Sequence, residues 1–186
     1  MTEEVLIAGF GGQGVLLAGQ ILAHAAMNAD LETTWFPSYG PEMRGGTANC
    51  TVVYSDEEIG SPIASQFDAV IALNQPSMER FEPRLRPGGR LLLNASMIPT
   101  QPKRTDIVVI RVPAVDLAKD AGEARAANVI MLGAYLATAP SMPEHAVIQA
   151  LRETFSAKGD KVIQVNLRAL ALGRQVAESQ LPALHA

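Results

Sequence analysis

The sequence predicts an α/β layered domain with a mostly parallel sheet and a helical last third. Short apolar, strand-like runs alternate with segments of helical periodicity over most of the chain, which is typical of this class. Helical periodicity then dominates from residue 114 to residue 178. The 186 residues fit one domain, and 48% apolar residues can fill a core in which aromatic side chains, at 5%, are few.

The chain is expected to open with a strand over 4–9 and a helix over 13–28. The strand is short and apolar and ends in glycine, which is typical of a buried parallel strand. In the helix, Val15, Leu22 and Ala26 recur at helical spacing among small residues. This pattern indicates a helix that packs closely on a sheet.

The later elements follow from the same two patterns. Pro76 suits the first turn of a helix, and "PGG" at 87–89 predicts a turn before a strand. Pro140 and Pro143 separate two of the C-terminal helices. Strands are predicted at 33–36, 47–55, 67–73, 90–94 and 106–112, helices at 75–85, 114–121, 125–139, 143–156 and 162–178, and a loose tail at 181–186.

Charge and hydropathy argue against two classes of partner. The net charge is -4 with no basic block, which gives nucleic-acid binding no support. No run reaches the roughly 18 apolar residues of a membrane span. The start "MTEEVLIAG" is acidic rather than basic and is not typical of a signal peptide. We therefore expect no nucleic-acid partner, no membrane contact and a cytoplasmic location.

The reactive residue types are sparse. The one cysteine, Cys50, cannot form an internal disulfide or supply the four thiolates that an iron–sulfur cluster usually needs. His24, His145 and His185 lack the spacing of metal ligands, so no metal site is expected. Neither a Ser–His–Asp set nor a pair of carboxylates stands out. We expect no catalytic residue in this chain, which fits a part of an enzyme better than an enzyme alone.

A glycine-rich turn joins the first strand to the first helix. Gly9, Gly11 and Gly14 form the pattern G-x-G-x-x-G, with Gly12 inside it. Such a turn lets a ligand approach the backbone, and the N–H groups at the helix start attract an anion. The alternative is that the glycines only let the helix pack closely against the strand.

Classical dinucleotide binding makes one further demand. An acidic residue should end the second strand, about 20 residues on, and hold the ribose of the nucleotide. The second strand instead runs into "TTWFPSYG": Asp30 and Glu32 precede it, and Glu42 lies in the loop beyond. A stand-alone NAD(P)-binding dehydrogenase of the Rossmann type therefore stays only as an alternative.

The second unusual segment is "WFPSYGPEMRGGTANC", residues 35–50. A loop that follows a parallel strand lies at the carboxyl edge of the sheet, where ligands usually bind. Arg44 is the one cation that the sequence places near the glycine turn, and a guanidinium can hold a phosphate or carboxylate at two points. Pairing with Glu42, which would only fix the loop, is the alternative. The apolar residues around it suit either a partner surface or ordinary packing under a loop.

Together, the glycine turn and this second segment resemble the gamma subunits of 2-oxoacid:ferredoxin oxidoreductases. The likeness runs from Val5 to Gln175 and includes "NVIMLGAYL" at 128–136. Asn128 in that stretch is expected to cap or hydrogen-bond at a helix start, with contact to a ligand as the alternative. The 2-oxoglutarate type (2-oxoglutarate synthase) is the nearest match, because this chain has "EMRG" where the pyruvate type has "ERRG".

The resemblance implies a three-layer α/β/α sandwich, with a gamma-type catalytic domain of pyruvate/ketoisovalerate oxidoreductases over residues 1–180. It implies an enzyme that decarboxylates a 2-oxoacid on thiamine diphosphate, forms an acyl-CoA and CO2, and reduces ferredoxin. Thiamine diphosphate, magnesium and [4Fe-4S] clusters are then expected on alpha and beta subunits and, in complexes that contain one, on a ferredoxin-like delta subunit. The isolated chain would be inactive and could form a homodimer. A regulatory or binding module without electron transfer is a further alternative.

The resemblance also implies where coenzyme A would lie. The glycine turn and the second segment would face the active site together and hold the phosphate-bearing part of coenzyme A. Residues expected to bind coenzyme A or another anion are Gly9, Gly11, Gly12, Gln13, Gly14, Ser38, Tyr39, Arg44, Gly45 and Gly46. Residues expected to contact partner subunits are Trp35, Phe36, Pro41, Glu42 and Met43.

Overall fold

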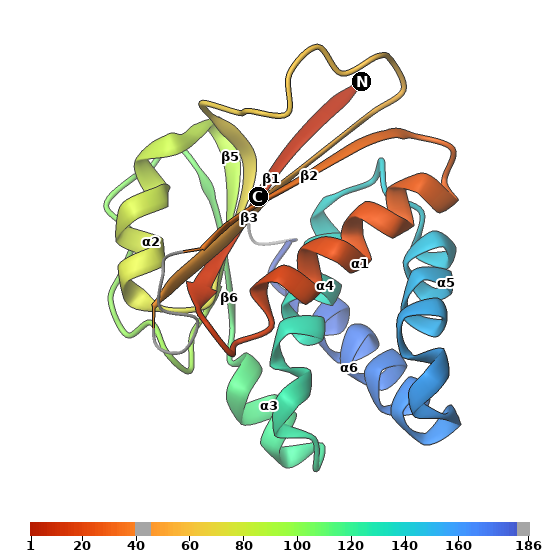
Figure 1. The fold of residues 1–186 in the computed structure, drawn as a ribbon. Coiled ribbons are helices and arrows are strands. Elements are labelled where there is room, and N and C mark those ends of the chain that lie inside the picture. The colour runs from red at the N-terminus through yellow and green to blue at the C-terminus, as the bar shows by residue number, and fades with distance from the viewer. Residues whose placement is uncertain (40–45, 182–186) are drawn as a thin grey trace.

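A central β-sheet organises the molecule (Figure 1). The computed structural model describes residues 1–39 and 46–181, apart from the side chain of Tyr39. Six strands form the sheet in this part of the chain. In the order in which they lie side by side, they are β2 (Glu32–Tyr39), β3 (Thr47–Ser55), β1 (Thr2–Phe10), β4 (Phe67–Ala72), β5 (Leu85–Asn94) and β6 (Val108–Val112).

The sheet is mostly parallel, as predicted. β1 pairs in parallel with β4, β4 with β5, and β5 with β6. β3 is the reversed strand and pairs antiparallel with both β1 and β2. Too few residues separate the end of β2 at Tyr39 from the start of β3 at Thr47 for a crossover, so the chain must turn back.

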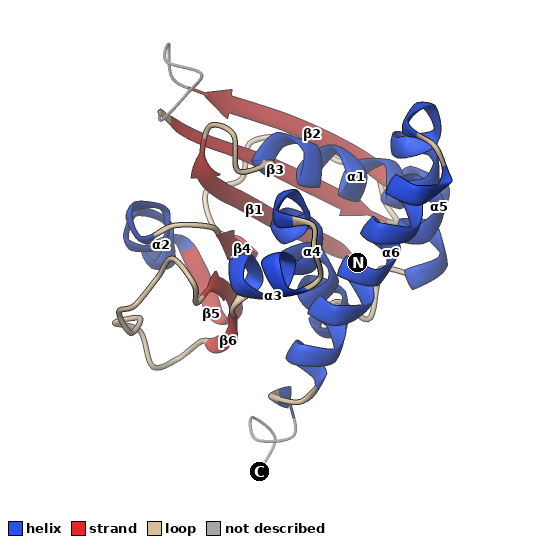
Figure 2. Ribbon diagram, turned by 90° about the horizontal axis from the view of Figure 1, so that it is seen from below, coloured by secondary structure: helices blue, strands red, loops and turns tan. Residues whose placement is uncertain are grey.

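Helices cover both faces of the sheet, unequally, which confirms the three-layer α/β/α prediction. In Figures 1 and 2, α2 lies on one side of the sheet and the other helices lie on the opposite side. The bounds are α1 (Val15–Asn28), α2 (Gln75–Phe81), α3 (Ala114–Asp120), α4 (Ala127–Thr138), α5 (Glu144–Phe155) and α6 (Asp160–Glu178). The last third is helical, as the sequence predicts.

The alternation of side chains along β1 gives each layer its own core. Val5 and Ile7 face the thick helical layer, and Leu6 and Ala8 face α2. All four are at most 1% exposed, so β1 is buried on both faces. Burial on both sides explains why the strand reads as one apolar run rather than as an alternating pattern.

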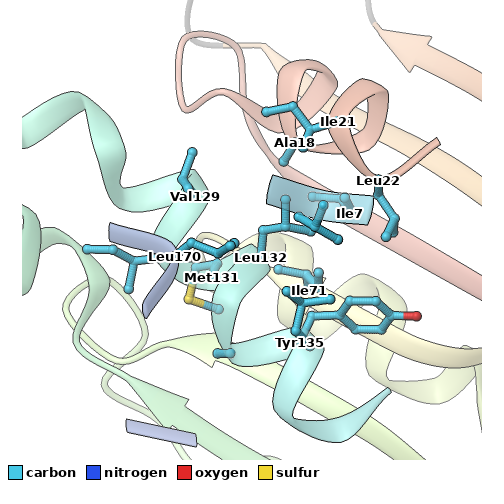
Figure 3. Close-up of a cluster of buried hydrophobic side chains, with 14 of the residues drawn as sticks. Ile7, Ala18, Ile21, Leu22, Ile71, Val129, Met131, Leu132, Tyr135 and Leu170 are labelled. Atoms are coloured by element: carbon cyan, nitrogen blue, oxygen red, sulfur yellow. The ribbon is translucent and has the colours of Figure 1, made fainter. Parts of the chain in front are cut away.

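Helix α4 lies at the centre of the thick layer. Figure 3 shows its side chains between Ile7 and Ile71 of the sheet, Ala18 and Leu22 of α1, and Leu170 of α6. Apolar residues all around α4 are buried, from Val129 to Leu136. A helix that is apolar all round is buried either in a core or in a membrane, and α4 is buried in the core of this domain. No helix within the described ranges is long and apolar enough to cross a bilayer.

Two predicted boundaries are wrong. The turn predicted at 87–89 lies inside β5, where Gly88 has a φ of 74° and the pairing with β4 shifts register. A bulge takes up these residues without ending the strand. The helix predicted over 75–85 ends at Phe81, and a 3-10 turn, Glu82–Arg84, follows. The predicted tail lies outside the described residues from 182 onward.

Cys50 provides a first test of this fold. It is fully buried on β3 beneath α1, and its thiol donates to the carbonyl of Val15, with the sulfur 3.6 Å from the oxygen. Burial raises the pKa of the Cys50 thiol to about 12. We expect the folded chain to resist iodoacetamide at pH 8 and the urea-unfolded chain to react. Rapid labelling under native conditions would contradict the burial.

The same shift sets a direction for stability. An unfolded cysteine titrates near pH 8.5, whereas the folded thiol stays protonated until about pH 12. Deprotonation therefore favours the unfolded chain, and Cys50 should lower the free energy of unfolding progressively as the pH rises above roughly 8.5. A Cys50→Ala variant should lose less stability between pH 8 and pH 10 than the parent chain.

Candidate functional site

The glycine turn lies at the carboxyl end of β1, where the strand order changes direction. From β1 the chain passes through α1 to β2 on one side, whereas β4 lies on the other side of β1. Such a switch point is where open α/β sheets usually bind ligands. The N–H of Gly11 donates to the carbonyl of Gly46 at 2.9 Å. The turn and the end of the second segment therefore meet, as the sequence predicts.

Two glycines in this turn have conformations that other residues rarely adopt. Gly12 has a φ of 95° and Gly14 has a φ of 77°. Gly14 is also the N-cap of α1, and it supplies no side chain to cap the helix. The first turn of α1 contains no acidic residue. The partial positive charge of the helix start is thus not neutralised from within this helix.

Gln13 braces the turn from inside. Its side-chain oxygen accepts hydrogen bonds from the N–H of Phe10 at 2.6 Å and from Nδ2 of Asn74 at 3.0 Å. Its Nε2 donates to the carbonyl of Leu73 at 3.4 Å. A Cβ on Gly9 would lie 2.6 Å from the same Gln13 oxygen. Gln13 thus ties the turn to Leu73 and Asn74, which follow β4 in the chain.

Three asparagines extend this bracing to the neighbouring elements. Asn74 caps α2 by accepting from the N–H of Ser77 at 3.0 Å. Asn94 donates to the carbonyl of Leu73 at 3.3 Å and accepts from the N–H of Ala114 at 3.2 Å. Asn128 of α4 donates to the carbonyl of Gly14 at 3.1 Å. Because amides do not titrate, this bracing of the carboxyl edge does not depend on pH.

Two cavities flank the turn. The apolar cavity has a volume of about 610 Å³, and the polar cavity has a volume of about 340 Å³. Gly12, Gly14 and Leu17 line both. The apolar cavity is otherwise lined by Phe10, Gly11, Val15, Leu16, Trp35, Pro37, Gly46, Thr47 and Ala48, and the polar cavity by Gln13, Leu73, Asn94, Val115, Ala124, Arg125, Ala127 and Asn128. The turn is thus the shared wall of both cavities, and the smaller one is called polar here because Arg125 and three side-chain amides line part of it.

The predicted residues of the second segment divide into three groups. Trp35 is half-buried, packs against the main core and lines the apolar cavity, whereas Phe36 of the same strand is 50% exposed. Ser38 is exposed near the end of β2. The backbone of Tyr39 ends β2, but its side chain and Pro41, Glu42, Met43, Arg44 and Gly45 lie outside what the structure describes.

Arg125 is the residue that sequence reasoning missed. Arg44 was expected to be the one cation near the glycine turn, and this was wrong, because Arg125 lines the polar cavity together with Gly12 and Gly14. Arg125 is exposed and lies in the 3-10 turn Ala124–Ala126 that leads into α4. No local pattern marks it, since only the folding of α4 against α1 brings it to the turn. Asn128 forms a hydrogen bond at a helix start as expected, but its partner belongs to α1.

The described residues hold no group of three or more His, Cys, Asp and Glu side chains that could bind a metal ion. The oxygens, nitrogens and thiolates that a metal or an iron–sulfur cluster needs are therefore not gathered at this turn in the part of the chain that the structure covers.

Known proteins with the same arrangement identify the fold family. The family model "Pyruvate ferredoxin/flavodoxin oxidoreductase" matches residues 4–176. The ketoisovalerate oxidoreductase subunit VorA of Methanothermobacter marburgensis is 44% identical over 179 residues, which are 96% of this chain and 37% of the relative. The chain thus spans little more than a third of that relative's length.

Two solved structures share the fold. The 2-oxoglutarate:ferredoxin oxidoreductase from Magnetococcus marinus, solved with 2-oxoglutarate, coenzyme A and succinyl-CoA bound, is 26% identical with a TM-score of 0.87 over 96% of this chain and 31% of that one. The gamma subunit of a keto/oxoacid ferredoxin oxidoreductase from Geobacter sulfurreducens is 30% identical with a TM-score of 0.81, over 95% of this chain and 99% of that one. The chain therefore belongs to the pyruvate ferredoxin/flavodoxin oxidoreductase family.

Proposed function

We propose that this chain is the gamma subunit of a thiamine-diphosphate-dependent 2-oxoacid:ferredoxin oxidoreductase, and that it covers the active site and helps to hold coenzyme A. The observation that carries the proposal is the glycine turn, which lies at the switch point of the sheet between two cavities. A neighbour with the same fold was solved with coenzyme A bound, which supports this choice of ligand.

The complete enzyme would convert a 2-oxoacid, coenzyme A and oxidised ferredoxin into an acyl-CoA, CO2 and reduced ferredoxin. Thiamine diphosphate, bound with magnesium on partner chains, would supply the carbanion chemistry, and their iron–sulfur clusters would carry two electrons to ferredoxin. Alpha and beta subunits, and in some complexes a ferredoxin-like delta subunit, would provide these groups.

The role of this chain would be to bind and orient coenzyme A. Gly12 leaves open space over the backbone, because a Cβ placed there would meet no atom within 4 Å. The uncapped start of α1 offers N–H groups and a partial positive charge to a phosphate. Arg44, on the loop between β2 and β3, would add a two-point contact.

The substrate is proposed to be 2-oxoglutarate, with branched-chain 2-oxoacids as the competing class. The 2-oxoglutarate enzyme among the structural neighbours supports the first, and the 44% identity to a ketoisovalerate subunit supports the second. Comparing kcat/KM of the purified complex for 2-oxoglutarate and 2-oxoisovalerate would decide between them. A stand-alone NAD(P)-dependent dehydrogenase has no support from the family match.

Purification of the native complex under anaerobic conditions tests the assembly directly. Thiamine-dependent and iron–sulfur chains should accompany this chain in a fixed ratio, as mass spectrometry would show. A chain that survives gentle lysis without partners would contradict the proposed function and return attention to the dinucleotide alternative.

Replacing Arg44 with alanine tests the hold on coenzyme A. A charge-assisted hydrogen bond contributes about 1.5–3 kcal/mol, so we expect the KM for coenzyme A to rise about tenfold or more with kcat little changed. Arg152 is the matched control, because it is an exposed arginine on α5, which packs near the far end of α1 through the contact of Asn28 with Glu153. An unchanged KM for coenzyme A in an intact complex would remove Arg44 from the site.

A further inference from the structure

We propose that the polar cavity between the glycine turn and α4 binds a phosphate group of coenzyme A, with Arg125 as its charged ligand and Asn128 as its neutral one. The inference rests on the proposed function and assigns a part of the ligand to a part of the site. Neither residue belongs to the glycine pattern or to the second segment, where the sequence led us to expect the phosphate contacts.

The lining of the polar cavity has the charge that a phosphate requires. Arg125 supplies a guanidinium, and the other polar side chains that line the cavity are the neutral amides Gln13, Asn94 and Asn128. No carboxylate lines this cavity among the described residues. Arg125 also forms no salt bridge within the described part of the chain, although other arginines there pair with acids. A guanidinium beside a concave site and without a carboxylate partner suits an external anion.

Asn128 provides an independent observation. Its residue is only 4% exposed, yet it lines the cavity. One N–H of its amide donates to the carbonyl of Gly14 at 3.1 Å. The second N–H and the amide oxygen have no hydrogen-bond partner among the described residues, whereas Asn94 uses both ends of its amide. Because a side-chain amide has two donor hydrogens and an acceptor oxygen, Asn128 offers a donor and an acceptor to a ligand in the cavity that it lines.

The donor and acceptor of Asn128 match a phosphate on a sugar. The free N–H can donate to a phosphate oxygen, and the amide oxygen can accept from an adjacent hydroxyl. The hydrogen bond to Gly14 fixes the orientation of the amide relative to the turn. Asn128 would therefore hold the ligand and the turn at the same time, so that a ligand in the polar cavity is positioned relative to the backbone of α1.

The N-termini of two helices add positive charge at the polar cavity. α1 begins at Gly14 and α4 begins after Ala126, and both N-caps lack a side-chain hydrogen bond. Neither helix has an acidic residue in its first turn. Their partial positive charges add to that of Arg125 at the cavity. The volume of about 340 Å³ leaves room for a phosphate with its sugar.

The test uses the intact complex with its partner chains and compares variants of Arg125 with a control variant. We expect Arg125→Ala to raise the KM for coenzyme A about tenfold, leave kcat within about twofold, and leave the KM for the 2-oxoacid unchanged. Arg125→Lys should recover part of the loss, because it restores the charge without the planar fork. Arg152→Ala is again the control and should change neither constant.

Dephospho-coenzyme A identifies which phosphate is bound. If the 3′-phosphate lies in the cavity, the parent complex should already bind dephospho-coenzyme A weakly, and Arg125→Ala should cause no further loss. If the diphosphate lies there, Arg125→Ala should raise the KM for both ligands to the same extent. Either pattern supports the assignment.

Two outcomes would overturn it. An unchanged KM for coenzyme A in Arg125→Ala, with assembly and Tm intact, would remove the phosphate from this cavity. A higher KM for the 2-oxoacid alone would show that the cavity takes a carboxylate. The proposed function has a separate test. It is contradicted if Arg44→Ala, Gly12→Ala and Arg125→Ala all leave the binding of coenzyme A to the complex unaltered. If Arg125→Ala alone leaves this binding unaltered, only the assignment of the phosphate to the polar cavity is contradicted.

Discussion

Gly173→Ala is expected to lower the free energy of unfolding of this chain by about 3 kcal/mol, at the upper end of the usual cost of overpacking. Gly173 lies where α6 crosses α4, and a Cβ on it would lie 1.7 Å from the carbonyl oxygen of Ile130. The reciprocal position, Gly133 of α4, would place a Cβ 2.0 Å from the carbonyl oxygen of Leu170. Since both obstacles are backbone atoms, no side-chain rotation relieves either clash.

Helix propensity acts in the opposite direction and makes the test sharper. Alanine in a helix interior is favoured over glycine by roughly 0.5–1 kcal/mol, so a loss of stability must come from the crossing. Urea and thermal unfolding of the purified chain would measure it, and about 3 kcal/mol corresponds to a fall in Tm of about 10 °C for a chain of this size.

Gly60→Ala is the matched control for Gly173→Ala. Gly60 lies in a loop, and a Cβ there would meet no atom within 4 Å. It should leave the unfolding midpoint within about 0.5 kcal/mol of the parent. Equal midpoints for Gly173→Ala and Gly60→Ala would contradict the close crossing of α4 and α6.

The crossing also bears on the site. Asn128 belongs to α4, and Arg125 immediately precedes it. A methyl group at Gly173 would shift α4 relative to the glycine turn, and both residues would move with the helix. We therefore expect any Gly173→Ala complex that still assembles to show a higher KM for coenzyme A as well.

Local sequence patterns were sufficient to predict the glycine turn and the helix α4. The glycine turn after β1 was predicted because a strand, three spaced glycines and a helix follow one another directly in the sequence. α4 was predicted as a buried helix from its apolar residues, and the structure confirms this. Its close contact with α6 could not be predicted, because that contact is long-range. The antiparallel direction of β3 could not be predicted from its residues, because a strand has the same apolar pattern in a parallel and in an antiparallel pairing.

Only the glycine turn of the candidate site could be predicted from the sequence, and the contacts made to it by distant residues could not. Gly12 and Gly14 were predicted to form a tight turn, and in the structure both have positive φ. The bracing contacts of Gln13 could not be predicted, because nothing in the sequence shows that its amide bonds Phe10 and Asn74. Arg125 was missed because its approach to the turn depends on the packing of α4, which is a long-range property.

Gly12→Ala and Gly14→Ala should separate ligand binding from folding. Both residues have positive φ, which costs an alanine about 1–2 kcal/mol. A Cβ on Gly12 meets open space, whereas a Cβ on Gly14 would lie 2.4 Å from Nδ2 of Asn128. We expect Gly12→Ala to lower the free energy of unfolding by about 1 kcal/mol, and Gly14→Ala to lower it by about 3 kcal/mol, since the clash and the lost Asn128 bond add to the strain.

Binding of coenzyme A should not follow that order. Gly12 forms part of the wall that both cavities share, so its new methyl group projects where a ligand would approach the backbone. We expect Gly12→Ala to raise the KM for coenzyme A at least tenfold in the assembled complex in spite of its small effect on folding. Urea unfolding and steady-state kinetics on the same preparations would compare the two effects.

A double-mutant cycle isolates the contact between the turn and α4. Asn128→Ala removes the group that the Gly14 methyl would strike, so the two substitutions together should destabilise the chain by at least 1 kcal/mol less than their separate effects summed. Asn128→Ala combined with Gly12→Ala should be additive, because nothing lies within 4 Å of a Gly12 Cβ. Additivity in both cycles would mean that α4 does not hold the turn, and the polar cavity would then lose the wall that fixes Asn128 beside Gly14.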